Sequence, residues 1–149
     1  MIEGVKLISL EVHADDRGYL IEILRAADEH FTKFGQVYLV GDMARGTIRA
    51  FHKHNVMWDF FFIGHGSAKF ALVDDRPESP SYRKMETVVI GERNPSLMVV
   101  PPGVYHGWMS LVDDTLMMSI ASEVYNREHP DEVRVPPDSF DYQWEVKGR

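Results

Sequence analysis

The hydrophobic residues of this 149-residue chain occur in short β-branched and aromatic runs, and this pattern constrains the fold more than any other feature. Turn-forming sequences such as Asp-Arg-Gly, Gly-His-Gly and Pro-Pro-Gly separate the runs. Runs of this kind are typical of β-strands. The predicted strands span 5–10, 19–24, 36–40, 47–51, 60–63, 68–74, 85–90, 97–100 and 115–121, and 26–34 is predicted as a short helix.

Many short strands in a chain of this length favour one all-β domain over 1–149, built as an antiparallel sandwich, jelly roll or barrel. With 44% hydrophobic residues the chain has enough apolar side chains for a core. The charged and proline-rich segment after 126 is expected to run irregularly over the surface. We expect Phe140, Tyr142 and Trp144 to anchor it, and 131–134 to serve subunit contacts.

Composition excludes several classes of function. The chain has no cysteine, so disulfides and thiolate chemistry are excluded, and a metal would need histidine and carboxylate ligands. A net charge of -7 argues against a nucleic-acid or anionic-membrane surface, although a small anionic ligand remains compatible with a local cationic pocket. The first residues do not resemble a targeting segment, and a cytoplasmic location is expected.

A histidine pair marks the candidate site. His52 and His54 are two apart, so on a strand they face the same side, and Asp59 returns toward them after a turn. His106 follows a Pro-Gly turn and supplies a third imidazole. These four residues predict a site for divalent Fe, Mn, Ni, Cu or Zn. The alternative is a surface histidine pair together with a histidine satisfied in the core.

Both stretches resemble the two motifs of the cupin superfamily. The first motif has the form G, five residues, HxH, three or four residues, E, six residues, G, and Asp59 stands here where glutamate is usual. The second motif, PxG, two residues, H, is matched by Pro101, Gly103 and His106. The resemblance implies a double-stranded β-helix, that is, a jelly-roll barrel with its site inside.

A longer resemblance, from about 11 to 144, is to the dTDP-4-dehydrorhamnose 3,5-epimerase family. The matching segments are DDRGYLIE at 15–22, GTIRAFH at 46–52, VDDRPESPSY at 73–82, PPGVYHG at 101–107 and YN at 125–126. The resemblance implies a homodimer that acts on a nucleotide-linked keto sugar without a cofactor. It also implies that His52 is the catalytic base, and that Arg17, Glu22 and Arg49 bind the nucleotide and its pyrophosphate.

The chain departs from that family at three places. Asp59 stands at the position of a catalytic lysine, and Ser119 at that of a catalytic tyrosine. The C-terminal segment that supplies an aspartate partner for the base is shortened. An anion at Asp59 would oppose a developing oxyanion by about 1 to 4 kcal/mol at about 4 Å, whereas a bound divalent cation would make Asp59 a ligand. Tyr105 and Ser119 are the candidates for a replacement acid in contact with substrate.

Three functions follow. The first is an epimerase or isomerase of a nucleotide-linked 4-keto sugar, which abstracts a proton next to the ketone with His52 and Asp59 as catalytic residues. The second is a metal-dependent cupin enzyme that acts on another small molecule through His52, His54, Asp59 and His106. The third is a non-catalytic cupin that binds a sugar.

Overall fold

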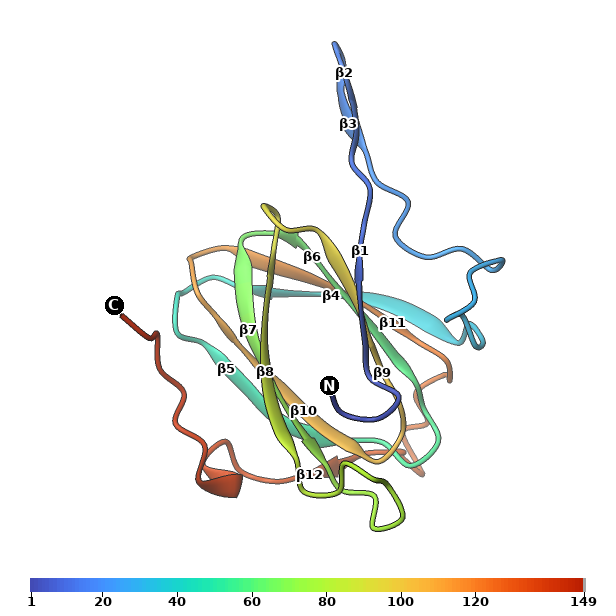
Figure 1. The fold of residues 1–149 in the computed structure, drawn as a ribbon, viewed down its shortest axis with the longest axis vertical. Helices are drawn as coiled ribbons and strands as arrows, with labels where there is room; N and C mark the ends of the chain where they lie inside the picture. The colour runs from blue at the N-terminus through green and yellow to red at the C-terminus, as the bar shows by residue number, and fades with distance from the viewer. Residues whose placement is uncertain (149) are drawn as a thin grey trace.

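Two five-stranded antiparallel sheets form a jelly roll in this computed structural model, which describes residues 1–148 (Figure 1). The first sheet has the order β1(Lys6–Ser9), β9(Ser96–Val100), β6(Asp59–His65), β11(Thr115–Ala121), β4(Gln36–Asp42). The second has the order β12(Val133–Arg134), β5(Ile48–Lys53), β10(Val104–Ser110), β7(Ser67–Asp74), β8(Met85–Gly91). The predicted all-β cupin architecture is therefore confirmed.

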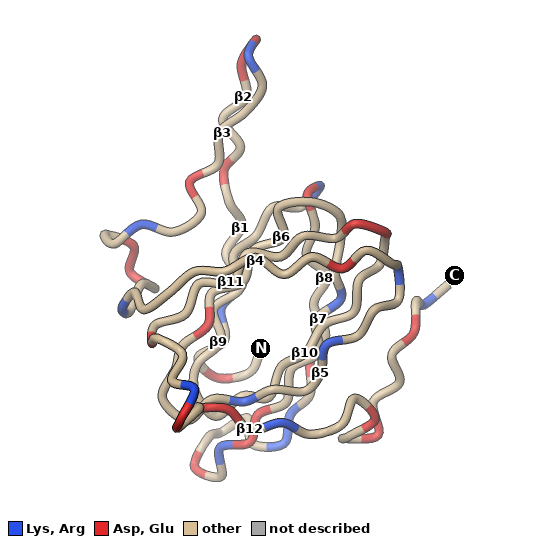
Figure 2. The backbone as a smooth tube through the Cα atoms, turned by 180° about the vertical axis from the view of Figure 1, so that it is seen from behind, with Lys and Arg blue, Asp and Glu red and all other residues tan. Residues whose placement is uncertain are grey.

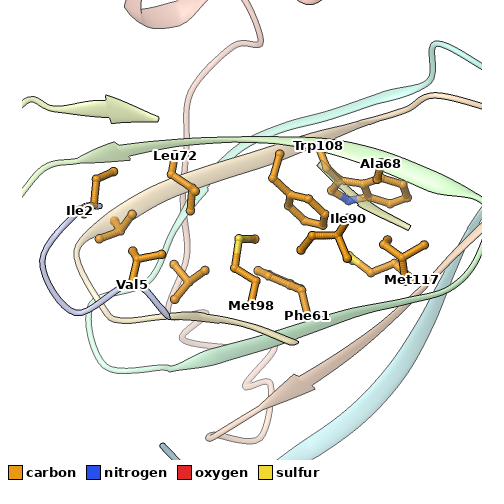
Figure 3. Close-up of a cluster of buried hydrophobic side chains, with 13 residues drawn as sticks. Ile2, Val5, Phe61, Ala68, Leu72, Ile90, Met98, Trp108 and Met117 are labelled. Atoms are coloured by element: carbon orange, nitrogen blue, oxygen red, sulfur yellow. The ribbon is translucent and has the colours of Figure 1, made fainter. Parts of the chain in front are cut away.

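Apolar side chains from both sheets meet between them, as Figure 3 shows. Phe61 and Met98 come from the first sheet, Phe70 and Trp108 from the second, and Ile2 enters from the N-terminal segment. Each fully buried side chain of this size contributes roughly 1.5–3 kcal/mol to folding. Phe61 and Trp108 also line a cavity inside the barrel, so the core supports the candidate site directly.

The C-terminal segment covers the outer face of the second sheet. Rings of Phe140 and Trp144 lie 5.2 and 5.5 Å from that of Phe51, and Tyr142 packs beside them. Of these three aromatic residues, Phe140 lies in the short 3-10 helix η1(Ser139–Asp141). The predicted aromatic anchoring of the tail is confirmed.

β10 is absent from the predicted strands. All seven of its residues are buried, because the core covers one face and the C-terminal segment the other. A strand covered on both faces lacks the alternation of polar and apolar residues by which strands are recognised.

The helix predicted over 26–34 is wrong. Turns occupy 26–30 instead, with hydrogen bonds from Asp28 N to Arg25 O and from Phe31 N to Asp28 O. The Asp28 carboxylate accepts a bond of 2.7 Å from the Arg25 backbone N–H. Both backbone bonds join residues three apart, the spacing of turns, and the described backbone does not continue them as an α-helix.

A hairpin of β2(His13–Asp15) and β3(Gly18–Leu20) projects away from the barrel, with acidic and basic residues at its tip (Figures 1 and 2). The predicted strand over 19–24 thus ends early, at Leu20. In the described part of the chain no helix has the length and apolarity to cross a membrane, and the cytoplasmic location stays a prediction.

Candidate active site

A β-bulge between β5 and β10 turns two residues three positions apart toward the same side. His52 lies opposite His106, whereas Arg49 lies opposite Trp108. Since His106 and Trp108 are two apart on β10 and both line the barrel interior, Arg49 and His52 share that side as well. The bulge therefore brings the predicted base and the predicted anion contact to one cavity.

Gly107 permits the close approach of these strands. A Cβ at this position would lie 2.3 Å from the Cβ of Ala50 and 2.8 Å from its Cα. Any side chain would therefore push β5 and β10 apart at the bulge.

The cavity inside the barrel has a volume of about 440 Å³, within the usual range for small-molecule sites. Both sheets and the segment around β12 line it. The polar lining residues are Tyr38, Arg49, His52, His54, Asp59, His106, Glu132 and Arg134.

His52 is paired with a carboxylate. Its Nδ1 lies 2.8 Å from Oε1 of Glu132, whose Oε2 accepts a bond of 3.0 Å from Arg134. Burial works to raise the pKa of Glu132, but the hydrogen bonds from Arg134 and His52 lower it below the ordinary value, so Glu132 is ionised. An ionised carboxylate at Nδ1 holds the proton on that nitrogen and leaves Nε2 with the lone pair of a base.

Glu132 is absent from the residues predicted for the site. The sequence predicts subunit contacts for 131–134 and the loss of the carboxylate partner of the base. The second expectation is corrected, because β12 pairs with β5, aligns Arg134 with His52 and places Glu132 beside the base (Figure 2 shows the mixed charges around β12). The subunit contact of 131–134 stays a prediction. The signal was strand alternation: Glu132 and Arg134 share one face, and Val133 packs on the other.

His54, Asp59 and His106 form a second, more deeply buried group. His54 Nε2 lies 3.2 Å and His106 Nε2 3.5 Å from Oδ2 of Asp59. The other ring nitrogen of His54 faces the backbone carbonyl of Asp131, and that of His106 lies 3.1 Å from the carbonyl of Val104. Both nitrogens of His54 thus face oxygen acceptors.

The two histidines differ in charge. Although burial opposes it, the hydrogen bond and charge of Asp59 raise the pKa of His54 from 6.5 to about 9. Burial lowers the pKa of His106 to about 4, against the attraction of Asp59. At neutral pH, His54 is therefore a cation paired with Asp59, and His106 is neutral. The charge of His54 therefore offsets the anion that the sequence places at Asp59.

Three of the four predicted metal ligands lie together. The donor atoms of His54, Asp59 and His106 all lie within 4.8 Å of one another, close enough to converge on one ion if the side chains move slightly inward. His52 stands outside this group with its Nδ1 on Glu132. The four-ligand prediction is therefore corrected to three residues.

Of the other predicted substrate contacts, Arg49 lines the cavity, whereas Tyr105 and Ser119 do not. Arg49 lines the cavity, where its Nε donates a bond of 2.8 Å to buried Asp42. Tyr105 faces the outer side of the sheet and packs 5.2 Å from the Phe140 ring, so its nomination as a substrate contact is corrected. Ser119 is fully buried on β11.

Arg17 and Glu22 lie apart from the cavity of their own chain. Arg17 sits at the hairpin turn, where it is exposed and paired with Asp15, and Glu22 is exposed in the following segment, 3.8 Å from Arg25. Neither residue lines the cavity.

The VDDRPESPSY segment has a structural role. The carboxylate of Asp74 is buried and accepts bonds from Arg76, Ser79 and Ser81 at 2.6–2.9 Å. Burial works to raise the pKa of Asp74, but these bonds hold it well below its ordinary range. Arg76 also donates to the carbonyl of Glu3, so the segment ties the N-terminus to the barrel.

An antiparallel jelly roll with histidines and a carboxylate inside the barrel defines a cupin. Residues 1–148 match the family model for dTDP-4-dehydrorhamnose 3,5-epimerase. The chain belongs to this family, as the sequence resemblance predicted.

Two curated relatives are similar along nearly their whole length. The spore coat polysaccharide biosynthesis protein SpsL of Bacillus subtilis is 34% identical over 100% of both chains. The probable low-salt glycan biosynthesis epimerase Agl13 of Haloferax volcanii is 30% identical, over 99% of this chain and 98% of Agl13. A crystal structure of dTDP-4-dehydrorhamnose 3,5-epimerase from Bacillus anthracis, with TDP and pyrophosphate bound, superposes with a TM-score of 0.85 at 24% identity, covering 97% of this chain and 86% of the other.

Proposed function

We propose that this protein epimerises a nucleotide-linked 4-keto-6-deoxy sugar by removing a proton from carbon next to the ketone. The observation that carries the proposal is the pair of His52 and ionised Glu132 at the wall of a cavity of about 440 Å³. A relative named as a dTDP-4-dehydrorhamnose 3,5-epimerase and another named as a probable glycan biosynthesis epimerase support it, and they favour an enzyme over a non-catalytic sugar-binding cupin.

In this proposal Nε2 of His52 takes the proton and the ring becomes an imidazolium. Glu132 stabilises that cation through the 2.8 Å contact with Nδ1. A base of this kind needs a carboxylate to fix its tautomer and to balance the charge that forms on it. The role implied for His52 by the family resemblance is kept.

The second requirement is a positive group near the ketone oxygen, which gains charge as the enolate forms. Protonated His54 lines the cavity and serves here through its charge, since Asp59 and the carbonyl of Asp131 take both of its N–H groups; it replaces the lysine whose position Asp59 occupies. Asp59 keeps His54 charged, so its catalytic contribution is made through His54 rather than by proton transfer.

Two arginines suit the anionic part of the substrate. Arg49 and Arg134 both line the cavity and are partly exposed, and a guanidinium binds phosphate oxygens in pairs. Their place in a chain with a net charge of -7 supports a local site for a pyrophosphate.

A homodimer would explain the hairpin. Tyr19 and Leu20 are 72% and 58% exposed on β3, which projects from the barrel (Figure 1). We propose that the hairpin crosses to a second copy and brings Arg17 and Glu22 to that copy's cavity. Sedimentation velocity tests the dimer. A monomer at micromolar concentration would contradict it.

The epimerase proposal is tested with dTDP-4-keto-6-deoxyglucose in deuterated water, followed by NMR at C3 and C5. The expected result is exchange at one or both carbons in the wild type and its loss in His52→Asn. His65→Asn is the matched control, because His65 lies outside the cavity. Absence of His52-dependent exchange would refute the epimerase proposal.

A metal-dependent reaction remains a second candidate because three donors, His54, Asp59 and His106, converge. If these residues hold a divalent cation, it would supply the electrophile that His54 otherwise provides. Elemental analysis of freshly purified protein separates the two: stoichiometric metal that is lost in His106→Ala favours the metal, and its absence favours the cofactor-free epimerase.

A further inference from the structure

Tyr38 reaches the cavity from the sheet opposite His52. It lies on β4, whose alternate residues Tyr38 and Val40 line the cavity, and Val40 also packs against the core. His52 lies on β5 in the other sheet, and Figure 1 shows these strands in different walls of the barrel. A ligand bound between the two walls would therefore have Tyr38 on one side and His52 on the other.

The phenol of Tyr38 is the one side-chain hydroxyl among the described residues that line this cavity. Tyr38 is 45% exposed, so a ligand can touch it. The pKa of the Tyr38 phenol is raised chiefly by burial and further by the charges of Asp59 and Glu132. The neighbouring Ser119 hydroxyl acts in the opposite direction and lowers this pKa by less. At neutral pH the phenol therefore carries its proton and has one to donate.

Ser119 explains how Tyr38 fits. The two residues are direct partners across β11 and β4, and side chains in such a pair lie about 4.5–5.5 Å apart at Cβ. Ser119 is small, fully buried, and its Oγ has no hydrogen-bond partner within the described part of the chain. Ser119 therefore leaves room for the Tyr38 ring but has no access to a ligand, which corrects its nomination as the replacement acid.

Given the proposed function, we propose that Tyr38 is the catalytic acid that protonates the substrate on the face opposite His52. His52 Nε2 first takes the proton from carbon, and the C–H electron pair forms the enolate C=C as the ketone oxygen becomes negative. The enolate then re-forms the ketone, and its carbon takes the proton of the Tyr38 O–H. The phenolate regains a proton from solvent and the imidazolium loses one to solvent, so atoms and charge balance.

Because two residues carry the two protons, hydrogen exchange and inversion of the carbon can be measured separately. Removal of the proton and its return by His52 exchanges hydrogen for deuterium without inverting the carbon, because the imidazolium proton exchanges with solvent. Inversion requires the proton from the other face. Loss of the phenol should therefore stop inversion and leave exchange in place.

The test compares Tyr38→Phe with wild type on dTDP-4-keto-6-deoxyglucose in deuterated water. For Tyr38→Phe we expect at least about a 100-fold fall in epimer formation, the lower end for loss of a general acid, with exchange into recovered substrate kept within about tenfold. Tyr82→Phe is the matched control, since Tyr82 is of similar exposure, 39%, and lies outside the cavity.

Three outcomes would overturn the assignment. In the first, Tyr38→Phe forms epimer at the wild-type rate, which leaves the epimerase function standing without Tyr38. In the second, exchange and inversion fall together while the melting temperature is unchanged, which assigns Tyr38 to binding. In the third, the wild type itself shows no His52-dependent exchange, which removes the proposed function and the role of Tyr38 with it.

Discussion

Glu132→Gln isolates the charge of the carboxylate next to the base. The glutamine oxygen still accepts the Nδ1–H of His52, so the tautomer is kept, but the imidazolium formed on proton abstraction loses its counter-charge. In the wild type the Nδ1–Oε1 distance is 2.8 Å, and the two side chains are 28% and 20% exposed. The substitution therefore changes charge at nearly constant geometry.

The magnitude follows from the hydrogen bond involved. Hydrogen bonds to charged groups contribute about 1.5–3 kcal/mol, and each 1.36 kcal/mol in a barrier changes a rate tenfold, so kcat should fall about 10- to 150-fold. The partial exposure of Glu132 to solvent and the neighbouring charge of Arg134 both weaken the interaction, so we expect a decrease in kcat near the lower end, about 10-fold. KM should change little, because the lost interaction strengthens only as the imidazolium forms.

The assay is the initial rate of deuterium exchange and of epimer formation over a range of dTDP-4-keto-6-deoxyglucose concentrations. Glu128→Gln is the matched control, because it makes the same change at an exposed position of the same segment. A Glu132→Gln enzyme within about threefold of wild type in kcat, or one altered only in KM, would refute the role given to this carboxylate.

Three further predictions concern stability. In chelator-treated protein the raised pKa of His54 contributes stability that is fully present below pH 6.5, and about 3 kcal/mol of it is lost as pH rises through about 9. In thermal melts, Asp59→Asn should abolish this decrease of stability with pH. The pKa of Asp74 is depressed, so its contribution is present above pH 3.8 and lost below it, and Asp74→Asn should flatten the acid limb of melting temperature against pH. Gly107→Ala places a methyl group 2.3 Å from a neighbouring Cβ and should cost about 1–3 kcal/mol, or at least about 2 °C in melting temperature, whereas Gly148→Ala, in open space, should be neutral.

The sequence predicted the architecture and the histidines because these depend on local signals. Strand alternation and turn residues are local, and so is the two-residue spacing that turns His52 and His54 the same way. β10 was not predicted because burial on both faces removes the alternation of polar and apolar residues. The helix predicted over 26–34 is wrong because the apolar residues there are too few to hold a helix, and the backbone forms separate turns over 26–30 instead.

The electrostatic partners were not predictable in the same way. Glu132 lies 80 positions from His52, and its pairing depends on a two-residue strand that joins a sheet edge. Tyr38 lines the cavity because the pairing of β4 with β11 places it opposite the small side chain of Ser119. Such contacts arise from topology, and composition or motif spacing does not report them.

Residues 131 and 132 are consecutive, yet they serve different histidines. The backbone carbonyl of Asp131 faces His54, and the side chain of Glu132 binds His52. Asp131 also accepts the backbone N–H groups of residues 55–57 at 2.8–2.9 Å, which fixes the loop that leads to Asp59. A shift of this one short segment would remove the carboxylate from the proposed base and lower the pKa of His54 together, so a substitution here affects both histidines at once.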